Sequence, residues 1–128
     1  YAGRINDLQK SQLKLHRASL PGNTNKKITQ LYEQAIKLAP TNGKALIALA
    51  EHYQKNNDYT QAQMLFIRAA SLAGFAERAF IGHAQVYIEQ KNYDQAASML
   101  RKALKLNPSR QDLVQNIRLL DRMNNNQI

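Results

Sequence analysis

The chain has 128 residues, 44% of them hydrophobic and 21% charged, which suits one domain with a sizeable core and excludes a disordered tail. It contains no Cys, which excludes disulfides and thiolate chemistry, and no apolar run approaches the roughly 20 residues of a membrane-spanning helix. The net charge of +9 suits an acidic protein, an anionic membrane surface or nucleic acid as partner, and is equally compatible with a solvated surface.

Residues 4–40 are predicted to form an irregular first helical hairpin. Apolar residues recur at helical spacing in two segments, and residues 20–25 between them are of types that favour turns. Lys10, Lys14 and Arg17 share one face of the expected first helix, which makes it a candidate for phosphate contacts. The same helix is basic and only weakly repeat-like, so it is also a candidate homo-oligomer contact.

Two copies of a 34-residue pattern follow, 43–76 and 77–110, and they agree without a gap. The matching pairs are Ala45/Ala79, Ala50/Ala84, Tyr53/Tyr87, Tyr59/Tyr93, Ala62/Ala96, Ala69/Ala103 and Leu72/Leu106. Each copy predicts two helices, which are 44–56 and 59–73 in the first copy and 79–90 and 93–106 in the second. Asp58 and Asn92 are the expected N-caps of the second helices, and Gly74 is the expected terminator between the copies. Small alanines let the helices approach closely, while bulky side chains such as Phe66 fill the space between them.

The last helix is predicted at 111–124, with a frayed tail at 125–128. Leu113, Ile117 and Leu120 fall on one side of it and polar residues on the other. This pattern is typical of a capping helix that covers the last hydrophobic face of a repeat stack.

The spacing and the residues Tyr53, Asp58, Tyr59, Ala62, Phe66 and Ala69, matched by Tyr87, Tyr93, Ala96, Ala103 and Pro108 in the second copy, resemble the tetratricopeptide repeat. The resemblance covers 43–110 clearly, and 28–40 is similar to the second helix of a preceding unit. It implies an all-α fold, a right-handed superhelical solenoid of tetratricopeptide hairpins with a C-terminal capping helix, as one domain over 1–128. Leu46 and Phe80 stand where the family often has Trp.

In the tetratricopeptide family the first helix of each unit lines a groove that receives a peptide or helix of a partner protein. We expect this groove at the positions that the packing stripe leaves free, with Ile47, Ile81 and Ile88 as an apolar floor. The predicted groove residues are Lys44, Ile47, Glu51, Gln54, Lys55, Arg78, Ile81, Gln85, Ile88, Glu89, Gln115 and Asn116. Ile47 and Ile81 could equally pack between units. Some family members hold the terminal carboxylate of heat-shock chaperones in a Lys and Asn clamp, and Ile47, Glu51 and Gly82 at the matching places exclude that function.

The expected function is a protein-interaction scaffold or adaptor. The resemblance implies assembly of a bacterial envelope, pilus or secretion complex as candidate settings and selects none of them. A secretion chaperone and a basic nucleic-acid-binding repeat domain are the alternatives. No catalytic motif, metal pair or cofactor site is predicted, so the chain is not expected to be an enzyme. His83 falls on the packing stripe and is predicted to be a hydrogen-bonded core residue, and His52 a residue at the groove edge.

The Cys-free composition, rich in Asn, Gln and Lys, favours a bacterial chain from the cytoplasm or the envelope. The sequence begins at Tyr1 rather than Met, so we expect a processed or excised chain.

Overall fold

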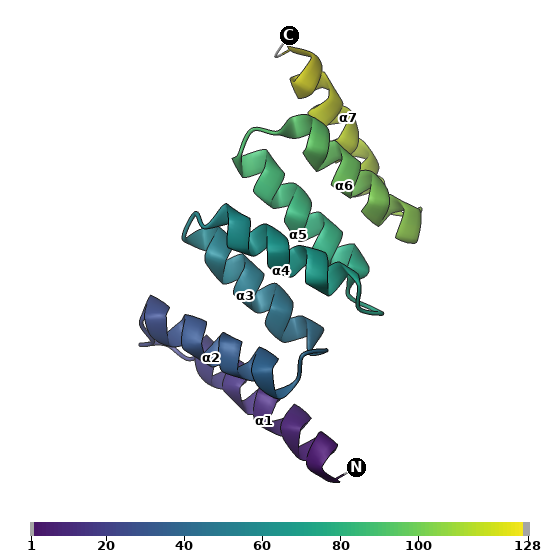
Figure 1. Ribbon diagram of the computed structural model, residues 1–128. Helices are drawn as coiled ribbons and strands as arrows, with labels where there is room; N and C mark the ends of the chain where they lie inside the picture. The colour runs from purple at the N-terminus through teal and green to yellow at the C-terminus, as the bar shows by residue number, and fades with distance from the viewer. Residues whose placement is uncertain (1, 127–128) are drawn as a thin grey trace.

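The computed structural model describes residues 2–126, and the side chains of residues 7–126. Within that part the chain forms seven α-helices and no strand. The helices are α1 (Ala2–Ser19), α2 (Asn25–Leu38), α3 (Gly43–Lys55), α4 (Tyr59–Ala70), α5 (Ala76–Glu89), α6 (Tyr93–Leu106) and α7 (Gln111–Asn126). Consecutive helices pack as hairpins, and the hairpins stack in chain order from one end of the molecule to the other (Figure 1). The prediction of an all-α helical-repeat solenoid is confirmed. None of these helices is both long and apolar enough to cross a membrane.

The core lies between the hairpins, in two clusters of buried side chains that meet at α5. On one side of α5, Ala79 and Val86 pack into the cluster that contains Phe66 of α4. On the other side, Ala84 packs into the cluster that contains Leu100 of α6. Helix α5 is therefore covered on both sides, as stacking of repeats requires.

The turns inside the second and third hairpins have the same backbone geometry. Asn57 and Lys91, 34 residues apart, both adopt left-handed φ angles of 62° and 61°. The following backbone N–H groups, of Asp58 and Asn92, donate to the carbonyl of a tyrosine five residues earlier at 2.9 and 2.8 Å. This is the long hydrogen bond of a Schellman motif. The side chains of Asp58 and Asn92 then cap α4 and α6, which confirms both predicted N-caps.

Two glycines allow aromatic rings to approach a helix backbone closely. A Cβ at Gly82 of α5 would clash with the Phe66 ring of α4, and a Cβ at Gly43 would clash with the ring of Phe75. These residues therefore set the distance between neighbouring helices, because any larger side chain would push the rings away.

The first hairpin is joined to the next helix by a buried polar network that the sequence analysis did not predict. The fully buried Ser11 of α1 donates to the Ala35 carbonyl of α2 at 2.6 Å. Asn42, which caps α3, donates to the Ser11 hydroxyl at 2.9 Å and accepts from the Ala45 backbone N–H. A satisfied network of this kind fixes the position of three helices relative to one another.

Three helix ends differ by two or three residues from the predicted ones, and both ends of α3 and the last residue of α5 differ by one. Helix α5 begins at Ala76, three residues earlier than predicted, because the Phe75 carbonyl already accepts a helical hydrogen bond and no side-chain cap marks the start. Helix α4 ends at Ala70, three residues early, before the left-handed turn at Gly74, which has the expected positive φ of 85°. Helix α7 runs to Asn126, so the predicted frayed tail is wrong for residues 125–126, and 127–128 lie outside the described residues.

Candidate functional site

Three clefts follow one another across the stack and share lining residues, so they form one continuous groove. The α2–α3 cleft, of about 540 Å³, is lined by Ala18, Ile28, Tyr32, Ala48, Glu51, His52, Gln54, Lys55 and Glu89. The α3–α5 cleft, of about 370 Å³, is lined by Ile47, Glu51, Gln54, Phe66, Arg78, Ile81, Gly82 and Gln85. The α5–α7 cleft, of about 350 Å³, is lined by Ile81, Ala84, Gln85, Ile88, Leu100, Arg110, Asp112, Leu113, Asn116, Leu119, Leu120 and Met123.

Equivalent positions of successive repeats line the successive clefts. Tyr32, Phe66 and Leu100 stand 34 residues apart on α2, α4 and α6, and each lines one cleft. A second set of residues with the same spacing also lines the three clefts, one residue in each: Ala48, Gly82 and Asn116. The clefts are therefore produced by the repeat itself, one between each pair of neighbouring units.

The structure brings most of the predicted groove residues together. Ten of the twelve line the clefts, and the two that do not are Lys44 and Gln115, which are exposed elsewhere on α3 and α7. Ile47 lines the α3–α5 cleft but is only 3% exposed, because it packs into the core cluster with Phe66. Of the two alternatives left open for Ile47, packing between units therefore holds, whereas Ile81 and Ile88 are partly exposed.

The groove residues that α2 contributes were not predicted, nor were those of α7 other than Asn116. Tyr32 lies on the second helix of its hairpin, where no groove residue was expected. Leu119 and Met123 lie on the capping helix beside the polar positions that were chosen. The 34-residue spacing could have found two of them, because Leu119 and Met123 stand one repeat after the predicted residues Gln85 and Glu89. Tyr32 has no such signal, because Phe66, one repeat later, was expected to fill the space between helices.

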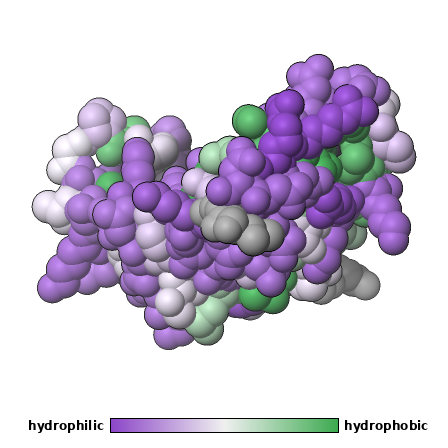
Figure 2. All heavy atoms as spheres, turned by 90° about the horizontal axis from the view of Figure 1, so that it is seen from above, coloured by the Kyte–Doolittle hydropathy of each residue, from purple (hydrophilic) through white to green (hydrophobic). Residues whose placement is uncertain are grey.

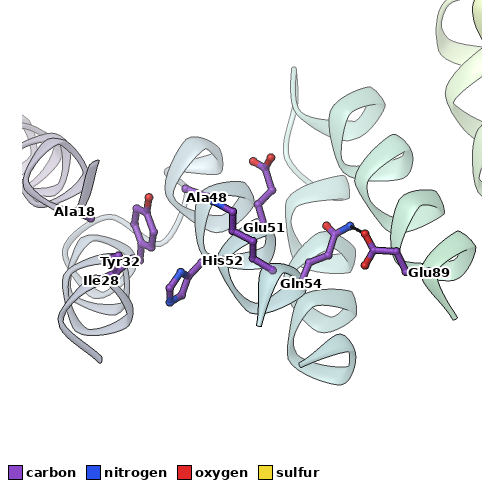
Figure 3. A pocket seen from close by; sticks show the side chains of 9 residues that line it. Ala18, Ile28, Tyr32, Ala48, Glu51, His52, Gln54 and Glu89 are labelled. Carbon is purple, nitrogen blue, oxygen red and sulfur yellow. Dashed lines mark hydrogen bonds between the residues drawn. The ribbon is translucent and has the colours of Figure 1, made fainter. Parts of the chain in front are cut away.

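The α2–α3 cleft has an acidic and aromatic wall. Tyr32 and Glu51 point to the same side of this cleft, while the His52 ring points to the opposite side (Figure 3). Burial raises the pKa of the Tyr32 hydroxyl, and the negative charge of Glu51 raises it further. At the end of this wall the Gln54 side-chain amide donates to the Glu89 carboxylate at 3.0 Å, which joins α3 to α5 across the groove.

The α5–α7 cleft is mainly apolar. Leu119 is 48% exposed, and Ile81, Ile88 and Met123 are partly exposed along the same cleft. A charged cluster closes one end, where the Arg110 guanidinium lies 3.0 Å from the Glu77 carboxylate and 2.6 Å from that of Asp112.

The Arg110 cluster also explains the pKa of one of its members. The hydrogen bond from the Arg110 guanidinium lowers the pKa of the Asp112 carboxyl, so Asp112 stays ionised. Because both carboxylates already bind Arg110, this guanidinium is not a free charge for a ligand.

The comparisons with known proteins agree with this repeat architecture. The family described as "Anaphase-promoting complex, cyclosome, subunit 3", which is of the tetratricopeptide-repeat type, matches residues 25–103, from α2 into α6. The chain belongs to this tetratricopeptide-repeat family. The solved structure of the "Arabidopsis OM64 TPR domain" is similar, with a TM-score of 0.76 and 20% sequence identity over 91% of this chain and 98% of that chain. At this identity the likeness shows the fold alone. No curated protein sequence matches closely enough to count as a relative.

The charges that line the groove of this tetratricopeptide domain cancel. The acidic lining residues are Glu51, Glu89 and Asp112, and the basic ones are Lys55, Arg78 and Arg110. The net charge of +9 therefore belongs to the rest of the chain. Much of the surface is hydrophilic, with hydrophobic residues confined to small areas on the face that Figure 2 shows.

The two histidines of the tetratricopeptide hairpins have structural surroundings. The His52 Nε2 lies 3.1 Å from the Thr29 hydroxyl, and the ring lines the α2–α3 cleft, as predicted. His83 is buried at 7% exposure and stacks on Tyr87, with ring centroids 4.7 Å apart. Its Nε2 has no hydrogen-bond partner among the described residues, so the predicted hydrogen bond is absent at that atom. Within residues 7–126, no group of three His, Asp or Glu side chains is placed to hold a metal ion.

Proposed function

We propose that this chain is a protein-interaction scaffold or adaptor, and that it binds a peptide or a helix of a partner protein in the continuous groove. Tetratricopeptide domains are commonly non-catalytic scaffolds of this kind. The observation that carries the proposal is the alignment of three clefts at equivalent positions of successive repeats, which gives an elongated site rather than a closed cavity.

The composition of the groove supports an extended protein ligand. A large apolar side chain such as Leu119, almost half exposed in a cleft, gains hydrophobic stabilisation when a ligand covers it. The amides of Gln85 and Asn116 line the same clefts and can pair with peptide groups. Apolar side chains that can be covered and polar groups that can form hydrogen bonds are the usual components of a protein-binding surface.

Assembly of a bacterial envelope, pilus or secretion complex is a setting that suits such an adaptor, and so is the work of a secretion chaperone. Both require a groove that holds a segment of another protein. The identity of the bound partner decides between them.

Nucleic acid is the second candidate partner, and the favourable observation is the charge outside the groove. Arg17 of α1 and Lys26 and Lys27 of α2 are all exposed near one end of the first hairpin. Binding through these residues would depend steeply on salt, because each phosphate contact releases counterions. It would also be unaffected by changes in the groove.

The test is a matched pair of substitutions on exposed apolar residues. Leu119→Asp places a charge in the α5–α7 cleft, and Ile67→Asp places the same charge on α4, at a residue that is 59% exposed and lines none of the three clefts. Both sites are open to solvent, so both variants should keep the helical circular-dichroism spectrum. Wild type and the two variants are then used to capture proteins from an extract of the source cells, with quantification by mass spectrometry.

We expect a specific protein to be recovered with wild type and Ile67→Asp and to be at least tenfold depleted with Leu119→Asp. A synthetic fragment of that protein should compete for binding. Equal recovery by all three proteins would exclude the groove as the binding site. Recovery of nucleic acid that disappears at high salt with all three would support the alternative.

A further inference from the structure

The groove changes its chemical character from one end to the other at equivalent positions. Glu51, Gln85 and Leu119 stand 34 residues apart on α3, α5 and α7, and each lines the groove. The same position of the repeat is thus acidic in one unit, neutral and polar in the next, and apolar on the capping helix. Because the backbone framework repeats, the side chain is what distinguishes the three places.

The acidic end offers a site for a single positive charge. The Glu51 side chain is exposed, and the ion pairs formed by residues 7–126 all lie elsewhere. Tyr32 lines the same cleft, with its hydroxyl on the same side as the Glu51 carboxylate (Figure 3). A carboxylate and an aromatic ring that line the same cleft are a favourable environment for a Lys or Arg side chain, through the ion pair and through cation–π attraction.

Lys55 also lines the acidic end, one helical turn after Glu51. Its charge is opposed by two carboxylates, those of Glu51 and Glu89, so the α2–α3 cleft keeps a net charge of −1 (two acidic and one basic residue). The net positive charge of +9 lies mostly on the rest of the chain. At physiological ionic strength, salt screens the effect of those charges beyond about 8 Å. A ligand with one basic residue at this place is therefore attracted locally, whereas a polybasic ligand is repelled by the remainder of the surface.

The apolar end lies on the other side of α5. Leu119 and Met123 of α7 face Ile88 of α5 across one cleft, and the only charged residues of its lining, Arg110 and Asp112, bind each other. Such a cleft favours a large apolar side chain and has no unpaired charge to attract an ion.

We propose that the groove binds its partner segment in one orientation, with a single basic residue at Tyr32 and Glu51 and a large apolar residue between α5 and α7. This inference rests on the proposed function of the groove. Neighbouring helices pack about 8–10 Å apart, so the two places are separated by roughly 16–20 Å. An extended peptide covers that distance in about five or six residues at about 3.3 Å per residue.

The experiment is a selection from a phage-displayed library of random 12-residue peptides on the immobilised wild-type chain, with counter-selection on Leu119→Asp. We expect the enriched peptides to contain one Lys or Arg and a large apolar residue about five or six positions away, always in the same order. The best peptide is then synthesised with a fluorescent label and titrated by fluorescence anisotropy. Glu51→Gln should weaken binding about tenfold, and a peptide with the two residues exchanged should bind as poorly.

Asp94→Asn is the matched control, because it also removes one exposed carboxylate but on α6, outside all three clefts. It should leave the affinity unchanged. The double substitution Glu51→Gln with Gln85→Glu moves the carboxylate one cleft toward the apolar end. Peptides selected on this variant should carry the basic residue about three positions closer to the apolar one.

The possible failures are distinct. Peptides that depend on Leu119 but show no basic preference, or that bind Glu51→Gln as well as wild type, would overturn the inference and leave the groove function intact. If acidic peptides were enriched and bound equally to Leu119→Asp, the exterior charge would be the binding site and the inference would be excluded. If no peptide were enriched over the bare support, the proposed function would fail, and the inference with it.

Discussion

The second and third hairpins, α3–α4 and α5–α6, follow one 34-residue pattern but fill equivalent positions differently. Where α4 places Phe66 in the core, α6 places Leu100. Where α3 buries Leu49, α5 buries His83. Positions occupied by Ala in both copies, such as Ala50 and Ala84, are buried in both.

The difference between the hairpins shows at which positions close approach of the helix backbones determines the residue type, and at which positions the neighbouring side chains determine it. Helices touch through the small residues, so these are the same in both hairpins. A larger side chain needs only a compensating partner, as Phe66 has in Gly82, where a Cβ would clash with its ring. Asn116 occupies the corresponding position beside Leu100, so the contact between the third hairpin and α7 does not require a glycine.

The largest expected effect on stability is at the Phe66 position. Phe66→Ala removes a ring that is 1% exposed and leaves a cavity beside Gly82, which has no side chain to fill it. We expect a loss of about 3–5 kcal/mol in the free energy of unfolding, measured by urea titration with circular dichroism. Leu100→Ala, the equivalent change in the third hairpin, should cost less. An equal or larger cost for Leu100→Ala would show that the two junctions do not differ as described.

The next effect concerns His83, the polar residue at the position that Leu49 occupies in the sister hairpin. Burial lowers the pKa of His83 from its ordinary 6.5, and the positive charge of Lys102 on α6 lowers it further. The unfolded chain therefore takes up the proton first as the pH falls. Stability should be constant above about pH 6.5 and should decrease as the pH falls through that value. The measurement is a series of urea titrations between pH 8 and pH 5.

His83→Leu is the variant that tests this. It removes a buried ring nitrogen without a hydrogen-bond partner and restores the residue type of the sister hairpin, so it should stabilise the chain by about 1–3 kcal/mol. It should also flatten the pH dependence in this range. His52→Gln is the control, since His52 is partly exposed in the groove and should leave most of the slope in place. A slope unchanged by His83→Leu would assign the pH dependence to other groups.

Much of the fold could be predicted because the repeat is a strong local signal. Two copies in one register predicted α3 and α6 to within one residue at each end, the start of α4, and both capping residues, Asp58 and Asn92. The first hairpin was harder, because Ser11 and Asn42 form their buried network between segments 31 residues apart that belong to no shared repeat. The start of α5 was misplaced because Phe75 offers no capping side chain as a signal.

The groove was predictable only in outline. Helical periodicity separates a packing stripe from a free face, and it placed Glu51 and Gln85 correctly in the clefts. It could not tell that α5 covers Ile47, because this depends on how closely α5 approaches once Gly82 accommodates a ring. It also could not separate the groove side of the capping helix from its outer side, which is why Leu119 was missed.

The smallest effect compares the two Schellman turns of the hairpins. Asn57 and Lys91 hold the same left-handed conformation, but an Asn side chain tolerates it better than a Lys side chain does. Lys91→Asn gives the third hairpin the residue of the second, and it should raise the free energy of unfolding by about 0.5–1 kcal/mol. The reciprocal Asn57→Lys should lower it by a similar amount.

The reciprocal pair makes this small effect measurable, because the two changes must have opposite signs. Each residue is exposed, and in each turn the backbone hydrogen bonds stay available. Asn57→Lys also removes the hydrogen bond that the Tyr59 hydroxyl donates to the Asn57 side chain at 3.1 Å, so Lys91→Asn is the cleaner test of backbone conformation. Lys91→Ala serves as control, since it removes the charge and the long side chain while keeping the unfavourable Cβ in the left-handed region. If Lys91→Ala stabilised the chain as much as Lys91→Asn, charge rather than backbone conformation would distinguish the two turns. If only Lys91→Asn did so, the hairpins differ here because the third one carries a residue poorly suited to a conformation that the repeat imposes.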